Sequence, residues 1–397
     1  MSEPEPDAVA VILVGDELLT GHTSDTNGPW LGRCLTDEGL RVVAITTAPD
    51  DVRLVVRAIE HGLEAARAVV VTGGLGPTPD DVTRAALARL PGEWTRSDLA
   101  NDVGLEPGVR LESGRGAVYA VPGVPAEMCV MVAGHVVADI LASAGPLSPR
   151  STRSLTVVGL GEPGVVELLA PVEEYLAGRG RLAYLPRPAE VEVRIAVRGV
   201  DADDVAAMAA VRARQLLGDL VAAEDKRIEE TVVEALRTRN ATVATAESLT
   251  GGLVAAALVS VAGASEAMRG GVVAYATELK AALVGVPAEV LQRDGAISPT
   301  TAAAMAEGVR VRCGAGFGVA TTGVAGPDPQ EGHPPGTMHI AVASEGQTRV
   351  GSFEPSGQRR DRQTVRRQAV VRALDLLRRT VTDVGPGSGE SSPVRTR

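Results

Sequence analysis

The chain has 397 residues, of which 45% are hydrophobic and 2% aromatic, and its formal net charge is −11. This length predicts two or three domains, whose cores are built from Val, Leu, Ala and Ile. The scarcity of aromatic side chains and the negative net charge argue against general nucleic-acid binding, which relies on cationic side chains and on aromatic side chains that stack on bases. Cys34, Cys129 and Cys313 are far apart, so neither a zinc site nor a disulfide framework is expected. With no signal peptide and no 18-residue apolar run, we expect a cytoplasmic protein without a membrane partner.

The first domain is expected over residues 1–147, as an α/β domain with a doubly wound, mostly parallel sheet. Apolar runs alternate with amphipathic segments, which is typical of parallel βαβ units. Residues 91–117 are rich in Gly, Asp and Pro and predict irregular structure. The expected strands are 8–14, 41–47, 68–72 and 117–121, and the expected helices are 26–39, 51–65, one from about residue 80 and one ending near 143.

Two further domains and a tail are expected. A small α/β domain over 148–224 has predicted strands at 153–158 and 190–198 and predicted helices at 163–177 and 202–217. A C-terminal α/β domain over 225–383 has predicted strands at 241–245, 316–321 and 337–343, helices at 226–238 and 361–382, and a long helix after residue 252. The Gly-, Ser- and Pro-rich tail, 384–397, is predicted to be disordered.

The first candidate site is the glycine-rich turn after strand 68–72. Gly73, Gly74 and Gly76 permit close backbone approach to a ligand, and amides at the next helix start suit a phosphate. Asp80 and Asp81 are of the type that holds Mg²⁺. They are equally typical of acidic residues at a helix N-terminus. Spacing alone leaves both interpretations open.

The second candidate site begins from the use of cations. The chain has two lysines and 37 arginines. Arginine keeps its proton in proteins, whereas a desolvated lysine becomes a neutral base. Lys280 is therefore a candidate general base, with a surplus surface cation as the alternative. Lys226 lies in a charged run and is expected on the surface.

Ser248 is the candidate nucleophile for this base. It follows a predicted strand, and the amides of Thr250, Gly251 and Gly252 are candidate oxyanion donors. No histidine stands in a triad context, which leaves Lys280 to activate the serine. Ser248 is also a suitable helix cap. Tyr275 either relays a proton or is a half-buried strand residue.

The N-terminal motifs carry a resemblance. Residues 15–21, 25–27, 72–83 and 122–128 resemble the molybdopterin-binding-like (MoaB/MogA-like) domain of the CinA family, and 159–162 fit the family's middle domain. In some members this domain is a metal-dependent ADP-ribose pyrophosphatase, which implies a divalent cation at Asp80 and Asp81. The implied nucleotide site comprises Asp16, Asn27, Gly73, Gly74, Gly76, Thr78, Asp80 and Asp81. Residues 91–117 are shorter than in the family, so a pocket wall is expected to be missing. The domain is then a degenerate binding or dimerisation module.

Residues 226–383 resemble the PncC-type nicotinamide-nucleotide amidase domain of the same family. The matching segments are 245–252, Tyr275-x-x-x-x-Lys280, 283–286, 295–298, 322–327, 335–337 and Asp361-Arg362-x-x-x-Arg366. The resemblance implies hydrolysis of nicotinamide mononucleotide to nicotinate mononucleotide and ammonia, without a cofactor. It implies Ser248 as nucleophile and Lys280 as base, with Tyr275 and Thr322 as polar groups. Thr277 stands where the family often has Asn, so one contact is expected to differ.

The phosphate of such a substrate needs its own contacts. Arg362 is a candidate, because arginine binds phosphate with a bidentate fork. The turn from Gly323 to Gly326 is a second candidate. The alternatives are an ordinary turn and the solvated face of a basic helix.

The sequence leaves three functions open. The leading hypothesis is a Ser–Lys amidohydrolase of pyridine-nucleotide salvage. The second is an ADP-ribose pyrophosphatase in the first domain, and the third is a non-catalytic nucleotide-binding scaffold. The expected partner is a small pyridine nucleotide rather than a nucleic acid, and the family suggests a homodimer.

Overall fold

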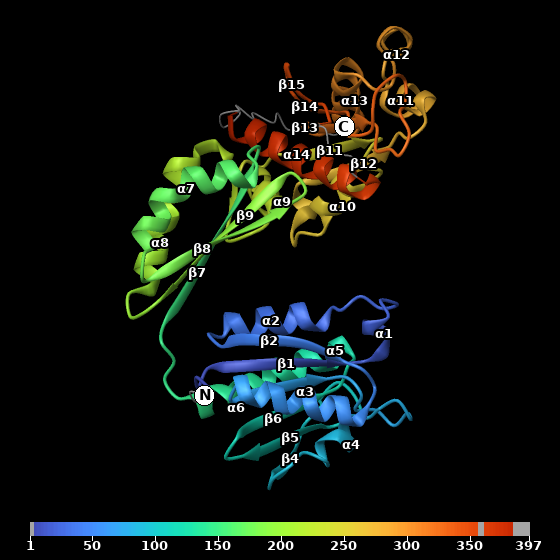
Figure 1. Cartoon of the computed structure of the whole chain (residues 1–397). Coiled ribbons are helices and arrows are strands. Elements are labelled where there is room, and N and C mark those ends of the chain that lie inside the picture. Colours follow the sequence, from blue (N-terminus) through green and yellow to red (C-terminus); the bar gives the residue numbers. More distant parts are fainter. Residues whose placement is uncertain (1–3, 356–360, 384–397) are drawn as a thin grey trace, which may run out of the picture. The chain divides into compact units, whose positions relative to one another are not determined.

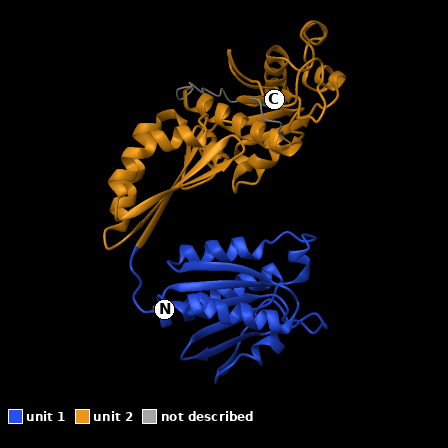
Figure 2. Cartoon of the chain, viewed as in Figure 1, with its two compact units in different colours: residues 1–149 blue, residues 150–397 orange. Residues whose placement is uncertain are grey.

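The structure is a computed structural model that describes residues 4–355 and 361–383. It forms two compact units, residues 1–149 and 150–397 (Figure 2). The described residues form three sheets, of six, four and five strands. The disorder predicted for 384–397 lies outside the described residues.

The first unit is built on a mixed sheet with the order β2-β1-β3-β6-β5-β4. Its parallel part comprises β1 (Ala8–Val14), β2 (Arg41–Ala48), β3 (Ala68–Thr72) and β6 (Gly116–Val121). The helices are α1 (Asp16–Leu19), α2 (Asn27–Asp37), α3 (Val52–Ala65), α4 (Thr83–Leu87), α5 (Pro125–Met131) and α6 (Val137–Ala144), with a π-helical turn at Val132–Val136 (Figure 1).

Alternate side chains of β1 supply two separate cores in this unit. Ile12 packs in a cluster with Val55 of α3, and Leu13 packs in another with Leu31 of α2. Successive strand residues point to opposite faces, so a strand covered on both faces is apolar throughout. The doubly wound, mostly parallel sheet predicted for this region is confirmed.

The segment predicted to be irregular, 91–117, instead contains an antiparallel hairpin. β4 (Thr95–Leu99) pairs with β5 (Gly108–Ser113), and β5 pairs with β6. β4 is an exposed, charged edge strand, a composition that protects edges from pairing with other chains. Because the strand has few apolar residues, a prediction based on apolar runs did not identify it. The helix predicted to start within 80–83 is α4, which begins at Thr83.

The helical stretch Pro125–Ala144 is, by length and composition alone, apolar enough to cross a membrane. In the structure it forms part of the core of the first unit. Met128, Met131, Val132, Val136 and Ile140 are all buried there. One face of the stretch therefore packs on the core of the first unit, with 33% of its most apolar window buried.

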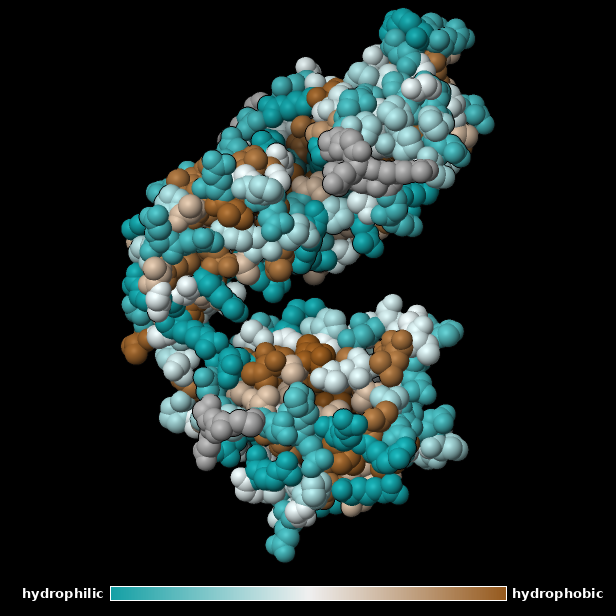
Figure 3. Space-filling model, viewed as in Figure 1, coloured by the Kyte–Doolittle hydropathy of each residue, from teal (hydrophilic) through white to brown (hydrophobic). Residues whose placement is uncertain are grey.

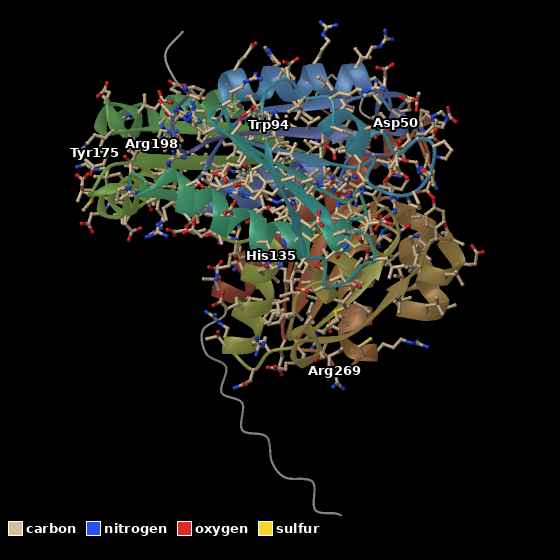
Figure 4. The ribbon with its side chains drawn as sticks, turned by 90° about the horizontal axis from the view of Figure 1, so that it is seen from below. Asp50, Trp94, His135, Tyr175, Arg198 and Arg269 are labelled. Carbon is tan, nitrogen blue, oxygen red and sulfur yellow. The ribbon has the colours of Figure 1, made fainter. Side chains whose placement is uncertain are left out.

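The second unit begins with a small antiparallel sheet of order β10-β7-β9-β8. Its core lies between the sheet and α7 (Glu162–Leu176) and α8 (Ala202–Leu217). The strands are β7 (Arg150–Val158), β8 (Gly180–Arg187), β9 (Glu190–Arg198) and β10 (Val221–Glu224). β8 and β10 were not predicted. Tyr175 and Arg198, labelled in Figure 4, belong to this part of the chain.

The C-terminal sheet has the order β12-β11-β13-β14-β15. Its strands are β11 (Val243–Glu247), β12 (Met268–Val273), β13 (Phe317–Gly323), β14 (Met338–Ser344) and β15 (Gln347–Phe353). The helices are α9 (Ile228–Thr238), α10 (Leu253–Val259), α11 (Thr277–Val284), α12 (Ala288–Asp294), α13 (Pro299–Arg312) and α14 (Arg362–Asp383). The long helix expected after residue 252 is the short α10.

Two cores sandwich this sheet. One contains residues of α9, α10 and α14, together with Val158 and Ala222 of the small sheet. The other contains residues of α11 and α13. On the face shown in Figure 3, hydrophilic residues cover most of the surface and hydrophobic residues gather in smaller areas.

Close packing of α13 on α11 gives a testable constraint on the fold. A Cβ at Gly308 would lie 1.7 Å from the carbonyl oxygen of Val284, so only glycine fits. We expect Gly308→Ala to lower the free energy of unfolding by about 2 kcal/mol, because an overpacked core must shift backbone. Denaturant unfolding measures this. Gly32→Ala, whose Cβ would meet only Ile45 at 3.7 Å, is the control without loss. An unchanged stability for Gly308→Ala would contradict the packing.

Candidate active site

Ser248 lies immediately after β11, at the carboxyl end of the parallel part of the sheet. Its N–H donates to Thr321 O of the neighbouring β13 (2.9 Å), which fixes the backbone there. The N-cap position of α10 is Gly252, not Ser248. Ser248 is therefore not the helix cap, and its hydroxyl contacts Lys280.

Glu247 takes the capping role that sequence alone left open. Its side chain is only 1% exposed. The carboxylate accepts hydrogen bonds from the amides of Gly252 (2.9 Å), Val254 (3.0 Å) and Ala255 (2.8 Å) and from the Thr250 hydroxyl (2.6 Å). These donors, at the positive end of α10, compensate the buried charge. Glu247 thereby fixes the turn that presents Ser248.

Lys280, on α11, reaches the serine from the other side. Its side chain is 2% exposed, and Nζ lies 3.1 Å from Ser248 Oγ. Nζ also donates to the carbonyl oxygens of Ala274 (2.9 Å) and Tyr275 (3.3 Å). Three oxygen atoms thus surround Nζ, which matches three donors of the ammonium or, when the amine is neutral and the Ser248 hydroxyl donates, two donors and one lone pair.

Burial makes the ammonium form of Lys280 less stable than it would be in water. Burial lowers the pKa of Lys280 below its ordinary value of 10.5, while Glu331 and Glu278 oppose that shift. No carboxylate pairs with Lys280 among the described residues. Desolvation without an ion pair destabilises an ammonium group, so the amine is prepared to accept a proton.

A small polar cavity of about 110 Å³ opens beside these two residues. Tyr275 and Arg362 lie at its entrance: the guanidinium of Arg362 donates to the Tyr275 hydroxyl (2.9 Å) and to Gly326 O (2.7 Å). Tyr275 is 61% exposed, so it is a rim residue rather than a core residue. The cavity is lined by Ser248, Leu249, Tyr275, Thr277, Lys280, Ala296, Ile297, Thr322, Gly323, Val324, Ala325, Gly326, Asp328, Gln330 and Arg362.

Three of the predicted substrate-binding residues do not line this cavity. The amide of Gly252 and the hydroxyl of Thr250 are engaged by Glu247, and Gly251 lies near Arg366. The carboxylate of Glu247 thus occupies the place proposed for an anion. Among the lining amides that have no acceptor in the described residues are those of Leu249, Ala325 and Gly326, which are candidate donors.

Sequence reasoning named the segment 295–298, which forms the opposite wall, but missed Glu331, which holds it in place. Glu331 accepts hydrogen bonds from the amides of Ala296 (2.8 Å) and Ile297 (3.2 Å). The Thr322 hydroxyl donates to Ala296 O (2.7 Å), so Thr322 supports this wall. Glu331 lies in a Pro- and Gly-rich loop with no periodicity, which left no sequence signal for its role.

The first unit has its own cavity, of about 410 Å³, where its glycine-rich turn ends. Of the residues predicted for a nucleotide site, Gly73, Gly74, Gly76, Asp80 and Asp81 line this cavity. The other predicted residues lie outside its lining. Asp16 exchanges hydrogen bonds with Asp50, Asn27 donates to Gly123 O, and Thr78 donates to Asp81.

This cavity is acidic. Its charged lining residues are Glu17, Asp50, Asp80, Asp81, Glu106 and Glu127. Burial raises the pKa of Asp50 (Figure 4), and the charges of Asp16, Glu17 and Asp80 add to that shift. Such a lining repels an anion that brings no cation.

Asp81, one of the two predicted cation ligands, is hydrogen-bonded within its own loop. The Asp81 carboxylate accepts from the Thr78 amide (2.7 Å) and hydroxyl (2.6 Å). Burial alone would raise its pKa, but these hydrogen bonds and one from Gly76 lower it. Asp81 thus closes its own loop. Within residues 4–355 and 361–383, no group of three or more His, Cys, Asp or Glu is placed to hold a metal ion.

Comparisons with known proteins agree with this architecture. Residues 10–142 match the probable molybdopterin binding domain, 152–222 the damage-inducible protein CinA KH domain, and 225–381 the CinA C-terminal domain. Fold and site thus define a three-part α/β protein with a buried Ser–Lys pair in its last part. The chain belongs to the CinA family.

The relatives include two curated proteins similar to nearly the whole chain. A CinA-like protein of Frankia casuarinae is 42% identical, covering 93% of this chain and 95% of that protein. A putative competence-damage inducible protein of Desulforudis audaxviator is 34% identical, covering 85% and 91%. The crystal structure of a CinA superfamily protein from Klebsiella pneumoniae is 34% identical and covers 39% of this chain and 95% of that chain, with a TM-score of 0.37.

The lowered pKa of Lys280 is directly measurable, because the chain has two lysines. With ¹³Cε-labelled lysine, the spectrum contains two lysine signals, and Lys226→Arg assigns them. We expect the Lys280 signal to titrate below 10.5, since burial without an ion pair favours the neutral amine. A midpoint at or above that value would contradict the desolvated site.

Proposed function

We propose that the C-terminal part of the chain is an amidohydrolase that converts nicotinamide mononucleotide to nicotinate mononucleotide and ammonia. The observation that carries the proposal is the 3.1 Å contact between Ser248 Oγ and a buried lysine amine without a carboxylate partner. The substrate is inferred from the family resemblance. The contact between Ser248 and Lys280 supports cleavage of its carboxamide by a serine nucleophile.

The proposed reaction has two halves. Lys280 accepts the Ser248 proton as Oγ attacks the carboxamide carbon, and the ammonium then gives that proton to the leaving nitrogen. Ammonia departs and an acyl-serine ester remains. Water attacks the ester while Lys280 again takes a proton, and its return to Oγ releases the carboxylate product. Both halves need donors for the oxyanion, and the open amides of Leu249, Ala325 and Gly326 are the candidates.

We expect Ser248→Ala and Lys280→Arg each to lower kcat for ammonia release by at least roughly 10²-fold, the range of general-base effects. Arginine keeps the charge but cannot act as the base. Wild-type kcat/KM should rise with pH as Lys280 loses its proton, at a midpoint below 10.5. Because Lys280 handles each proton transfer, turnover should survive a chelator.

Lys226→Arg is the matched control, since Lys226 pairs with Glu234 on the surface. Its turnover should equal that of the wild type. Wild-type rates in Ser248→Ala or Lys280→Arg would sink the mechanism, and no ammonia from the wild-type chain would sink the function.

Arg362 gives a separate prediction about the phosphate. Loss of a hydrogen bond to a charged group costs roughly 1.5–3 kcal/mol, about ten- to a hundredfold in kcat/KM. We expect Arg362→Ala to lose this much with nicotinamide mononucleotide but little with nicotinamide riboside, which lacks phosphate. Arg362→Lys should fall between, because lysine cannot form the bidentate fork.

Arg367→Ala is the control on the same helix, because Arg367 is exposed and does not line the cavity. Equal losses with both substrates would show that Arg362 only supports the loop at Gly326.

A pyrophosphatase in the first unit has weaker support. Among the described residues the lining has no Lys or Arg, so a pyrophosphate group would need a bound cation there, and the Asp81 carboxylate is already hydrogen-bonded to Thr78. The amidohydrolase proposal is therefore confined to the second unit.

A further inference from the structure

The Ser248 cavity has one acidic residue that the proposed reaction does not use. Among the described residues that line it, the charged side chains are those of Lys280, Asp328 and Arg362, so Asp328 supplies the only carboxylate. Asp328 is exposed, and its carboxylate has no hydrogen-bond or ion-pair partner within the described chain. It is therefore available to a ligand that carries a positive charge or hydrogen-bond donors.

Asp328 lies in a stretch whose backbone has little freedom. It stands between Pro327 and Pro329. Proline fixes its own φ, and it also restricts the residue before it to extended conformations. The backbone thus limits where the Asp328 carboxylate can lie, and less conformational freedom is lost when that carboxylate meets a ligand.

Both ends of this stretch are anchored to residues of the cavity wall. Before it, Gly326 O accepts a hydrogen bond from the Arg362 guanidinium (2.7 Å). After it, the Glu331 carboxylate accepts one from the Ala296 amide (2.8 Å). Because Arg362 and Ala296 themselves line the cavity, the short loop between these anchors keeps Asp328 beside it.

The proposed substrate carries one group that the contacts described so far do not address. Nicotinamide mononucleotide has a carboxamide for Ser248, a phosphate for Arg362 and, between them, a pyridinium ring with a fixed positive charge. Proteins stabilise such a cation with an opposite charge or with the face of an aromatic ring. Among the described lining residues Tyr275 is the one aromatic side chain, and its hydroxyl accepts from the cationic Arg362 (2.9 Å). The only opposite charge that the described lining offers is the carboxylate of Asp328.

We propose that Asp328 determines specificity for the oxidised, positively charged form of the nicotinamide ring. Its carboxylate stabilises the pyridinium cation, so the site prefers this form over the reduced dihydropyridine, which is uncharged and otherwise carries the same groups. This inference rests on the proposed amidohydrolase function and extends it to a class of substrate, the cationic pyridine nucleotides. Two opposite charges about 4 Å apart are worth a factor of roughly five in water, and more in a less polar cavity.

Calorimetry on the full chain with Ser248→Ala, which cannot form the acyl-serine, measures binding without turnover. The probes are nicotinamide mononucleotide and its reduced form, and the readout is the ratio of their dissociation constants. Any effect of Asp328 on the phosphate is common to both probes and cancels in this ratio. We expect the oxidised form to bind at least roughly five-fold more tightly, because only its ring is charged. Adding Asp328→Asn should abolish most of this preference, and salt should reduce it by screening the exposed carboxylate.

Two further variants separate charge from shape. Asp328→Glu keeps the charge and should retain at least part of the preference. Asp204→Asn removes the same charge from an exposed position of α8 that does not line the cavity, so it should leave the ratio unchanged. Equal affinities for the two forms with Asp328 in place, an unchanged ratio after Asp328→Asn, or no binding at millimolar concentration overturns the proposal.

Ammonia release by the wild-type chain, measured alongside, distinguishes failure of this inference from failure of the proposed function. Release from nicotinamide mononucleotide, together with a ratio that does not respond to Asp328→Asn, overturns the ring specificity alone. No release, together with a ratio that does depend on Asp328, overturns the amidohydrolase and leaves a binding site for a cationic pyridine nucleotide.

Discussion

The candidate active site depends on one amine held by three neutral oxygen atoms. Lys280 Nζ contacts the Ser248 hydroxyl and the carbonyls of Ala274 and Tyr275. An acidic partner in that shell would stabilise the ammonium and remove the base. The surrounding fold maintains this shell. β11 ends directly before Ser248, and α13 packs against α11 where Gly308 approaches Val284 closely.

The helix α14 contacts the loops beside the Ser248–Lys280 pair and also lines a second, larger cavity of the second unit, of about 580 Å³. Its Arg366 donates to Thr250 O (2.8 Å), in the turn after the nucleophile, and Arg362 holds Gly326 O and Tyr275. Further along the same helix, Gln368 and Leu376 line the larger cavity. One helix therefore holds both the loop after Ser248 and the loop at Gly326.

Strands buried along their whole length were predictable, whereas most edge strands were not; the edge strand β2 was predicted, and β5, inside its sheet, was not. The strands Ala8–Val14 and Ala68–Thr72 are buried throughout, and both were predicted with these bounds, because strands covered on two faces read as unbroken apolar runs. β4, β12 and β15 lie at sheet edges with exposed residues. The pairing of Ser248 with Lys280 followed from chemistry. The role of Glu331 did not, because it depends on a loop distant in sequence.

The two glycine-rich turns show why such a motif alone does not define an anion site. After β3, the carboxylate of Asp81 accepts from the Thr78 amide; after β11, the carboxylate of Glu247 accepts from Gly252, Val254 and Ala255. In both turns the chain supplies its own anion, so amides that the sequence offers to a phosphate are already satisfied. The consequences differ. The Asp81 carboxylate is hydrogen-bonded within a loop beside an acidic cavity, whereas the hydroxyl of Ser248, next to Glu247, remains available to contact Lys280. Chemistry at such a turn therefore depends on which residue the internal carboxylate leaves exposed.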